Sequence, residues 1–298
     1  MRPRSSFVYA VLLASMVASA LAGPVAAAAP QAPAATIDPG PSQPQPEPTD
    51  GPPAITPLVG SAQRGAPAPA QLGLTAAQVK AKEDAFATWL AEGASGVSPM
   101  VGSSGSLPGW VEWHQKTNYW CVVATLQSIA HYRWGDHYVT PSVYSWQYYL
   151  FTSGNGNVGI GTSDSAGFVW VNGQIKAQEP SSTFYYAYAK DTSAPNFESR
   201  GVSDIGVWGF PLYVAVNVQS TYYAWHQNLP ATHATAAVAY GNNGAQLSIG
   251  DPFTSPSYAP YCATGVSNPG YSSTPDTGCI YGYYDGTNYF RAMVYEYW

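Results

Sequence analysis

The C-terminal third of the chain alternates short apolar runs with turn residues. Runs of Val, Ile, Ala and aromatic residues predict strands at 212–218, 234–240, 246–250 and 288–298. The second and third runs flank the segment GNNG at 241–244, and an Asn-Gly pair between apolar runs is typical of a tight antiparallel hairpin. We therefore expect this part of the chain to form an antiparallel sheet.

In the preceding segment the apolar positions recur at helical spacing. A helix is predicted to begin near Asn118, a good N-cap residue, and to end before Gly135. Its inward stripe consists of Val122, Leu126 and Ile129. Helical or turn-rich sequence follows at 141–150, the Gly-rich stretch 154–162 is expected to be a loop, and the pattern of 168–177 is ambiguous. Helices followed by an antiparallel sheet indicate the α+β class.

Composition divides the chain into four parts. Residues 1–28 combine a positively charged start with an uncharged apolar run, which is the layout of a secretory signal peptide. Residues 29–71 are rich in Pro and Ala and are expected to be a disordered linker. Residues 72–107 join a helical segment to a Gly/Ser linker, and 108–298 has the size of one domain. We expect a secreted, extracellular protein.

One amphipathic helix is predicted within 72–92. Thr75 and Gln78 fit a capping box, and Gly93 supplies a stop. The apolar positions at helical spacing are Val79, Phe86 and Leu90. This helix is either part of a pro-segment that covers a cleft or an ordinary packing helix, and the sequence leaves both interpretations open.

The mature chain carries few charges and is acidic. Its formal net charge of −6 becomes −8 once Arg2 and Arg4 are removed with the signal peptide. Only nine Lys and Arg residues then remain, which is too few for a basic surface that would bind nucleic acid or an anionic membrane. We therefore expect neither of these partners, and we expect a monomer.

The chain has three cysteines, so at least one of them cannot belong to a disulfide within the chain. Cys262 and Cys279 flank a loop rich in Gly, Ser, Pro and Asn, and a bridge that closes such a loop would contribute about 3 kcal/mol. We pair these two and leave Cys121 free. A free thiol in an oxidising compartment indicates a functional role for Cys121. The alternative is that Cys121 is a buried, inert cysteine.

The segment around Cys121 has the features of a thiol nucleophile. With Asn118 as N-cap, Cys121 is the third residue of its helix, where the partial positive charge of the helix start favours a thiolate. The free backbone N–H groups of the first turn can receive the negative charge that develops on a carbonyl oxygen under attack. Gln115, six residues earlier, is placed to direct its side-chain amide at the same oxygen.

A thiolate also needs a base, and His233 is distinguished from the other histidines by its strand and hairpin. That strand leads through the hairpin to Asp251, and counting outward from Asn242 places Asp251 within one position of directly opposite His233. Cross-strand neighbours lie about 5 Å apart at Cβ, so the carboxylate can accept the imidazole N–H and fix its tautomer. His114, His131 and His137 are interpreted as surface or core residues, and His226 has no acidic residue at a matching position.

Two segments resemble the motifs of C39-like, papain-like cysteine peptidases: QKTNYWCVVATLQSIAHYRWG, from Gln115, and HATAAVAYGNNGAQLSIGDP, from His233. The resemblance covers about 109–298. It implies these roles: Cys121 as nucleophile, Gln115 as oxyanion-hole residue, His233 as base and Asp251 as its partner. It also implies a papain-like fold, in which an N-terminal nucleophile helix packs against an antiparallel β-sheet, and a peptide or protein substrate. Family members commonly have Cys-Gly-Pro, whereas here Val122 adds bulk beside the nucleophile.

Three other functions stay open. A peptidoglycan amidase or endopeptidase of CHAP or NlpC/P60 type would use similar chemistry, although its Cys and His usually lie closer than the 112 positions here. The same residues would support acyl transfer to an amine. A non-catalytic binding module would use exposed aromatic rings, with these candidates: Tyr119, Trp120, Trp146, Tyr222 and Trp225. No HExxH or CxxC pattern occurs in the sequence, and we expect no metal and no cofactor.

Overall fold

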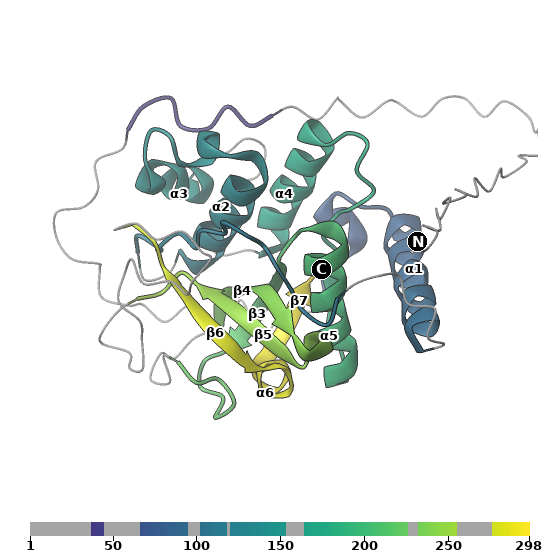
Figure 1. The fold of residues 1–298 in the computed structure, drawn as a ribbon. Helices are drawn as coiled ribbons and strands as arrows, with labels where there is room; N and C mark the ends of the chain where they lie inside the picture. The colour runs from purple at the N-terminus through teal and green to yellow at the C-terminus, as the bar shows by residue number, and fades with distance from the viewer. Residues whose placement is uncertain are drawn as a thin grey trace, which may run out of the picture. The chain divides into compact units, whose positions relative to one another are not determined.

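The computed structural model describes residues 37–44, 66–94, 102–117, 120–152, 164–225, 232–254 and 276–298. Within these ranges the chain mixes helices with one antiparallel sheet, which confirms the α+β class (Figure 1). The predicted features that lie outside the described residues are the signal peptide 1–28, the Gly-rich loop 154–162, Asn118, Tyr119, His226 and Cys262.

The sheet has seven strands within the described residues. Their order is β2 (Tyr188–Ala189), β7 (Met293–Tyr297), β3 (Leu212–Asn217), β4 (Thr232–Gly241), β5 (Gln246–Asp251) and β6 (Cys279–Asp285), and β1 (Gly105–Ser106) pairs with β4. The strands predicted at 212–218, 234–240 and 246–250 are therefore confirmed. The β4–β5 turn is η4 (Asn242–Gly244), in which Asn242, Asn243 and Gly244 all have positive φ. Asn and Gly tolerate this backbone conformation best, which is why the hairpin could be predicted from the sequence.

The run 288–298 is only half strand. Its first part belongs to helix α6 (Gly286–Ala292), and only the second part forms β7. The helix begins where the Asp285 carboxylate accepts the N–H of Asn288 at 2.7 Å, an N-cap bond. The prediction of one continuous strand was wrong because aromatic residues such as Tyr289 suit strands by propensity, whereas this cap favours a helix.

The helices within the described residues form two groups. Four of the helices are α2 (Cys121–Trp134), α3 (Val143–Thr152), α4 (Asp164–Gln178) and α5 (Ala194–Val202). The short 3-10 helices are η1 (Pro69–Leu72) and η2 (Asp136–Val139), and η3 (Ser203–Trp208) is a π-helix. The helix α2 contacts α3, α4 and β4, so it links the helical group to the sheet, and α5 packs with α6 near β4 and β5. None of these helices combines the length and the apolar character that a bilayer span requires.

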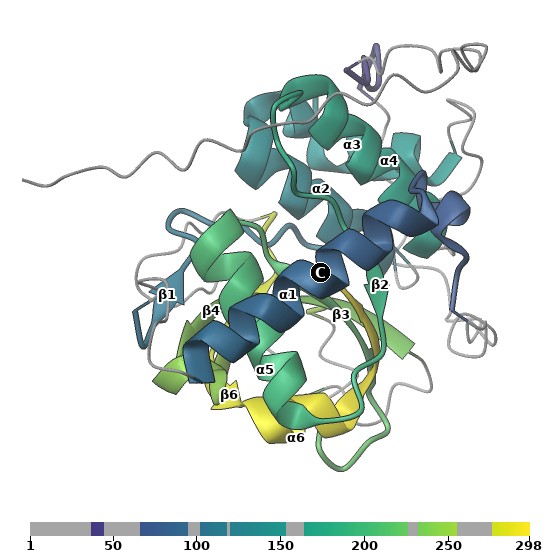
Figure 2. The same cartoon turned by 90° about the vertical axis from the view of Figure 1, so that its right-hand side faces the viewer.

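Helix α1 (Ala76–Ala94) confirms the helix predicted within 72–92. Its capping box is present: the Gln78 N–H donates to Thr75 Oγ1 at 3.2 Å, and the Thr75 N–H donates to Gln78 Oε1 at 2.9 Å. The helix runs past Gly93 by one residue. Its Phe86 ring packs on Trp298 with centroids 4.8 Å apart, so α1 lies beside the C-terminus of the chain (Figure 2).

Two parts of the predicted linkers belong to the folded body. Asp38, within the expected disordered linker 29–71, is buried, and its carboxylate accepts hydrogen bonds from Trp170 Nε1 at 2.6 Å and from Tyr149 Oη at 2.7 Å. Strand β1 and the buried Leu107 extend the domain to the N-terminal side of position 108. Composition misled here because a few side chains, and not the average of a segment, decide whether it packs.

Candidate active site

Cys121 is the first residue of α2, with Trp120 as its N-cap residue. The expected third position was wrong, because the chain makes a turn before the helix, in which the Trp120 N–H donates to Thr117 O at 3.3 Å. The first helical bond joins the Ala124 N–H to Trp120 O at 2.9 Å. Cys121 is a free cysteine and is 8% exposed. The first N–H groups of a helix have no acceptor within the helix, and the Cys121 N–H is one of them.

His233 and Asp251 form a buried pair across the β4–β5 hairpin. His233 Nε2 donates to Asp251 Oδ1 at 2.7 Å, as predicted. The expected register was nevertheless wrong. The hairpin is centred between Asn243 and Gly244, as the pair Gly241–Gln246 shows, and not on Asn242. An irregularity between Ala237 and Ala239 offsets part of this difference, so that Ala236 faces Gly250 and Asp251 lies two positions from directly opposite His233. The contact survives because residues two positions apart lie on the same face of a sheet and reach each other diagonally.

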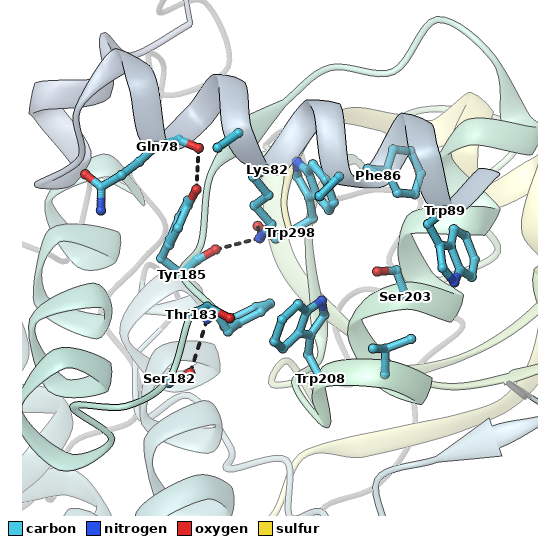
Figure 3. Close-up of a pocket in the computed structure, with 14 residues that line it drawn as sticks. Gln78, Lys82, Phe86, Trp89, Ser182, Thr183, Tyr185, Ser203, Trp208 and Trp298 are labelled. Atoms are coloured by element: carbon cyan, nitrogen blue, oxygen red, sulfur yellow. Dashed lines mark hydrogen bonds between the residues drawn. The ribbon is translucent and has the colours of Figure 1, made fainter. Parts of the chain in front are cut away.

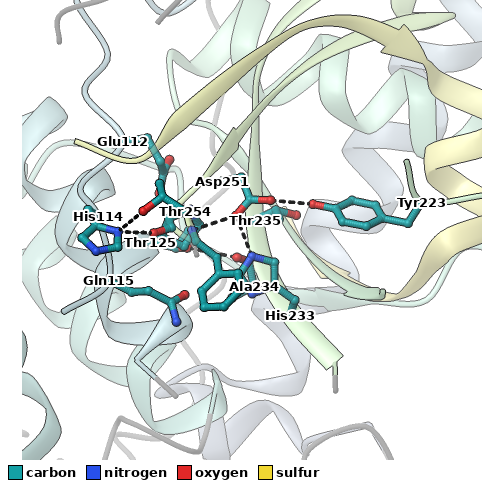
Figure 4. A network of polar contacts seen from close by, with 12 residues as sticks. Glu112, His114, Gln115, Thr125, Tyr223, His233, Ala234, Thr235, Asp251 and Thr254 are labelled. Carbon is teal, nitrogen blue, oxygen red and sulfur yellow. Dashed lines mark hydrogen bonds and ion pairs between the residues drawn. The ribbon is translucent and has the colours of Figure 1, made fainter. Parts of the chain in front are cut away.

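Three buried groups donate hydrogen bonds to the Asp251 carboxylate (Figure 4). Oδ1 also accepts the Phe253 N–H at 2.8 Å, and Oδ2 accepts the Tyr223 hydroxyl at 2.8 Å. Asp251 and Tyr223 have no exposed surface. A carboxylate held by three donors keeps its charge and its orientation, so Asp251 fixes the His233 ring in one position.

Cys121 also interacts with His233, through a side-chain hydrogen bond and a charge that both raise the pKa of the imidazole. Since Nε2 faces Asp251, Nδ1 is the nitrogen left for the sulfur. Burial lowers the pKa of His233, but the charges and hydrogen bonds of Asp251 and Cys121 outweigh burial and raise this pKa to about 10. His233 therefore carries a proton at neutral pH, as an imidazolium between two acidic partners.

Gln115 lies in the approach loop to α2 and is 2% exposed. Its backbone N–H donates to Pro252 O at 2.9 Å, which ties this loop to the residue after Asp251. Its side-chain Nε2 donates to Thr117 O at 2.8 Å, the carbonyl that also closes the turn before Cys121. The structure thus brings Gln115 to the start of α2 and next to the hairpin, and its role as oxyanion-hole residue stays a prediction.

A second carboxyl group, Glu112, lies beside Asp251. It accepts hydrogen bonds from Trp110 Nε1 at 3.1 Å and from Ser128 Oγ at 3.3 Å. Burial is the main cause that raises the pKa of Glu112 well above its usual range, and the Asp251 charge adds to it. A Cβ atom at Gly250 would lie 2.3 Å from Glu112 Oε2, so a glycine is needed next to Asp251.

Tyr223 and Glu112 were not predicted from the sequence, and His114 was interpreted only as a surface or core residue. His114 Nδ1 lies 3.1 Å from Pro252 O and 3.0 Å from Thr254 Oγ1, so His114 supports the loop after Asp251. Nothing in the spacing of these residues points to Asp251. The cluster of Tyr and Trp residues at 222–225, shortly before the His233 strand, was the one available signal for Tyr223.

The aromatic residues considered for a binding module separate into two kinds. Trp120 and Trp146 are buried in the core, whereas Tyr222 is 42% exposed. Cys279, expected to pair with Cys262, is buried at the start of β6. Because Cys262 lies outside the described residues, that pairing stays a prediction.

Within the described residues, no group of three or more His, Cys, Asp and Glu side chains is arranged to hold a metal ion. The reactive groups that the fold brings together are those of Cys121, His233 and Asp251, with their supporting donors. In comparisons with known proteins, no family model, no curated protein and no solved structure matched this chain.

Proposed function

We propose that this chain is a secreted cysteine hydrolase of the C39-like, papain-like type, which cleaves peptide or amide bonds. The observation that carries the proposal is the Cys121–His233–Asp251 array, in which a helix start and two strands bring together residues up to 130 positions apart in the sequence. A nucleophile at a helix N-terminus, a base bonded to it and a carboxylate behind the base form the arrangement that acyl transfer through a thioester needs.

In the proposed reaction the Cys121 sulfur attacks the carbonyl carbon of the scissile bond. The negative charge on the carbonyl oxygen is received by the Cys121 N–H and by the amide of Gln115. The carbon–nitrogen bond breaks as His233 gives its proton to the departing amine, which leaves a thioester. His233 then takes a proton from water, the hydroxide attacks the thioester, and the carboxylic acid and Cys121 are released.

The support for His233 as proton donor is its raised pKa, since an imidazolium at neutral pH is ready to protonate an amine. The support for a papain-like arrangement is the contact of the nucleophile helix α2 with β4: Thr125, one turn after Cys121, reaches Ala234 O at 3.5 Å with its hydroxyl. Export rests on the signal-like residues 1–28.

The test uses the mature, unreduced protein. An iodoacetamide-type probe should label Cys121 alone, and prior labelling should abolish hydrolysis of a mixed peptide library. The variant Cys121→Ala should keep its melting temperature and lose hydrolysis. If peptide mapping finds Cys121 in a disulfide, or if Cys121→Ala still cleaves, the proposal fails.

A further inference from the structure

The proposed reaction uses one carboxyl group, Asp251, and gives no role to the second one beside it, Glu112 (Figure 4). Glu112 is 1% exposed, so its side chain contacts protein groups and not solvent. Burying a carboxyl group destabilises a fold unless hydrogen bonds compensate for the lost solvation. The contacts of Glu112 therefore identify the parts of the molecule that it joins.

One oxygen of Glu112 contacts the nucleophile helix α2. The Ser128 hydroxyl lies 3.3 Å from Glu112 Oε1. Ser128 lies about two turns after Cys121, so the two side chains project from the same face of α2. The Trp113 N–H donates to Ser128 Oγ at 2.9 Å, which holds this hydroxyl in place. Glu112 is thus attached to the face of the helix that carries the nucleophile.

The other oxygen of Glu112 lies against β5. A Cβ atom on Gly250 would lie 2.3 Å from Oε2, so the carboxyl group packs on the strand backbone directly before Asp251. The Trp110 indole N–H donates to this oxygen at 3.1 Å. The Gly278 N–H donates to Glu112 O at 2.6 Å, which also fixes the backbone. Glu112 therefore bridges the nucleophile helix and the strand that carries the partner of the base.

The hydrogen bonds around Ser128 favour a protonated Glu112. A hydroxyl has one proton, and the Ser128 hydroxyl has two acceptors: Ala124 O at 2.9 Å and Glu112 Oε1 at 3.3 Å. A protonated Glu112 removes this shortage, because its own O–H can donate to Ser128 Oγ while Ser128 donates to Ala124 O. Burial is the main cause that raises the pKa of Glu112 well above its usual range, and the Asp251 charge raises it further.

We propose that Glu112 is a positioning residue of the candidate site: a neutral carboxyl group that joins the nucleophile helix to the strand of Asp251. It holds Cys121 and His233 at the separation that thioester formation needs, and its neutrality leaves the charge behind His233 to Asp251. This inference rests on the proposed cysteine hydrolase function. Because Glu112 acts through other residues, its replacement should change kcat and not KM.

Two substitutions in the full mature chain separate position from charge. Glu112→Gln is neutral and of equal length, and its amide can donate to Ser128 while its oxygen accepts from Trp110. Glu112→Asp keeps the acid but is one methylene shorter. We expect kcat on a cleaved peptide to stay within about 3-fold for Glu112→Gln and to fall at least about 10-fold for Glu112→Asp, with KM nearly constant. The opposite order would overturn the proposal.

Ser128→Ala tests the helix end of the same link, and it gives the measurement if Glu112→Asp does not fold. It should lower kcat about 10-fold. The matched control is Ser248→Ala, which removes a buried hydroxyl of β5 that donates to Tyr281 O at 2.6 Å. This control should keep its turnover. Equal losses in the two serine variants would indicate a general packing effect and would contradict the proposed link.

The protonation state is tested by stability, without any substrate. A proton held by Glu112 in the fold stabilises it fully below about pH 4.5, and this contribution is lost as the pH rises through the raised pKa of the folded state. The titratable groups that interact with the charge of Glu112 are Asp251, His233 and Tyr289. Because Gln cannot titrate, the melting temperature of Glu112→Gln relative to the unsubstituted chain should rise by roughly 3 °C per pH unit above pH 5. A constant difference would show that Glu112 is ionised in the fold.

Failure of the proposed function gives a different result from failure of this inference. If no peptide is cleaved by the unsubstituted chain, the hydrolase proposal fails. The rate at which iodoacetamide alkylates Cys121 then replaces kcat as the measure of position, since the thiolate depends on its contact with His233. Glu112→Gln should keep this rate, and Glu112→Asp and Ser128→Ala should lower it. Equal rates in all of these variants would overturn the role of Glu112.

Discussion

The molecule buries ionisable groups in two regions, and it treats them in opposite ways. Around Asp251 the carboxylate is matched: three buried donors hold it, and Glu112 fills the space where Gly250 has no side chain. Beneath α1, both Asp204 oxygens lack a partner in the described part of the chain, and Lys82 borders a pocket (Figure 3). A satisfied polar network is rigid, whereas an incomplete one can accept a ligand. The first region holds a fixed geometry, whereas the second leaves buried polar groups without partners in the described part of the chain.

The strongest way to break this comparison is to remove the centre of the rigid region. His233→Ala should lower kcat by roughly 10³-fold or more, because the imidazole serves both steps of the proposed reaction. Asp251→Asn should be milder, since an amide can still hold the ring. The control is His226→Ala, which should keep most of the turnover. Steady-state kinetics on a cleaved peptide measures all three, and the reverse order of the two histidines would disprove the assignment.

Adding a few atoms to each region sharpens the difference in packing. Gly250→Ala should lower the free energy of unfolding by about 1–3 kcal/mol, because the new methyl group overlaps Glu112. Ala85→Leu, in the lining of the pocket beneath α1, should leave it unchanged or raise it by up to about 1 kcal/mol. Urea denaturation compares the variants. Gly173→Ala serves as the control for glycine replacement, since a Cβ there meets nothing within 4 Å. If Gly250→Ala were as stable as that control, the region around Asp251 would not be tightly packed.

A smaller effect is expected when the hydroxyl of Tyr223, one of the three donors to Asp251, is removed. Tyr223→Phe keeps the ring and removes only the hydroxyl that donates at 2.8 Å. We expect kcat to fall about 10-fold with KM nearly constant, which corresponds to loss of one hydrogen bond to a charged group. Tyr222→Phe, its exposed neighbour, should have no effect. Equal kinetics for the two variants would mean that Asp251 does not need its third donor.

The pH dependence of stability gives the mildest test. The pKa of His233 rises from an ordinary 6.5 to about 10 on folding, so the folded state binds this proton more tightly than the unfolded state. The resulting stabilisation is complete below about pH 6.5 and is lost as the pH rises through about 10. The difference in melting temperature between the unsubstituted chain and His233→Gln should therefore shrink between about pH 6 and pH 10.5. A constant difference would show that His233 is not protonated in the fold.

Local patterns made the main strands and the hairpin predictable. Asn-Gly turn chemistry and the alternation of apolar runs act over a few residues, and they located His233 and Asp251 on neighbouring strands. The irregularity near Val238 was not predictable, because a bulge depends on what the whole sheet packs against. The turn centre was predicted too early along the chain, and the diagonal reach of the two side chains compensated for that error.

Long-range partners were beyond the reach of the sequence. Tyr223 lies 28 residues before Asp251, and Glu112 lies 139 residues before it. Neither the periodicity of apolar positions nor the spacing of motifs therefore relates these residues to Asp251. The same limit applies to Lys82, whose two acceptors belong to Tyr185 and to the last residue of the chain. The candidate catalytic residues could be inferred because their chemistry is distinctive, whereas supporting residues have ordinary types and gain meaning only from the fold.

The attachment of Asp38 changes the reach of the N-terminal spacer. As a free tether, residues 29–71 would span up to about 150 Å when fully extended. With Asp38 bonded to Trp170 and Tyr149, and with the proposed cleavage after Ala28, a new N-terminus lies at most about 30 Å along the chain from Ile37. Anything joined to the mature N-terminus would thus be held close to α3 and α4, and lengthening the chain between 45 and 65 would not move it further away.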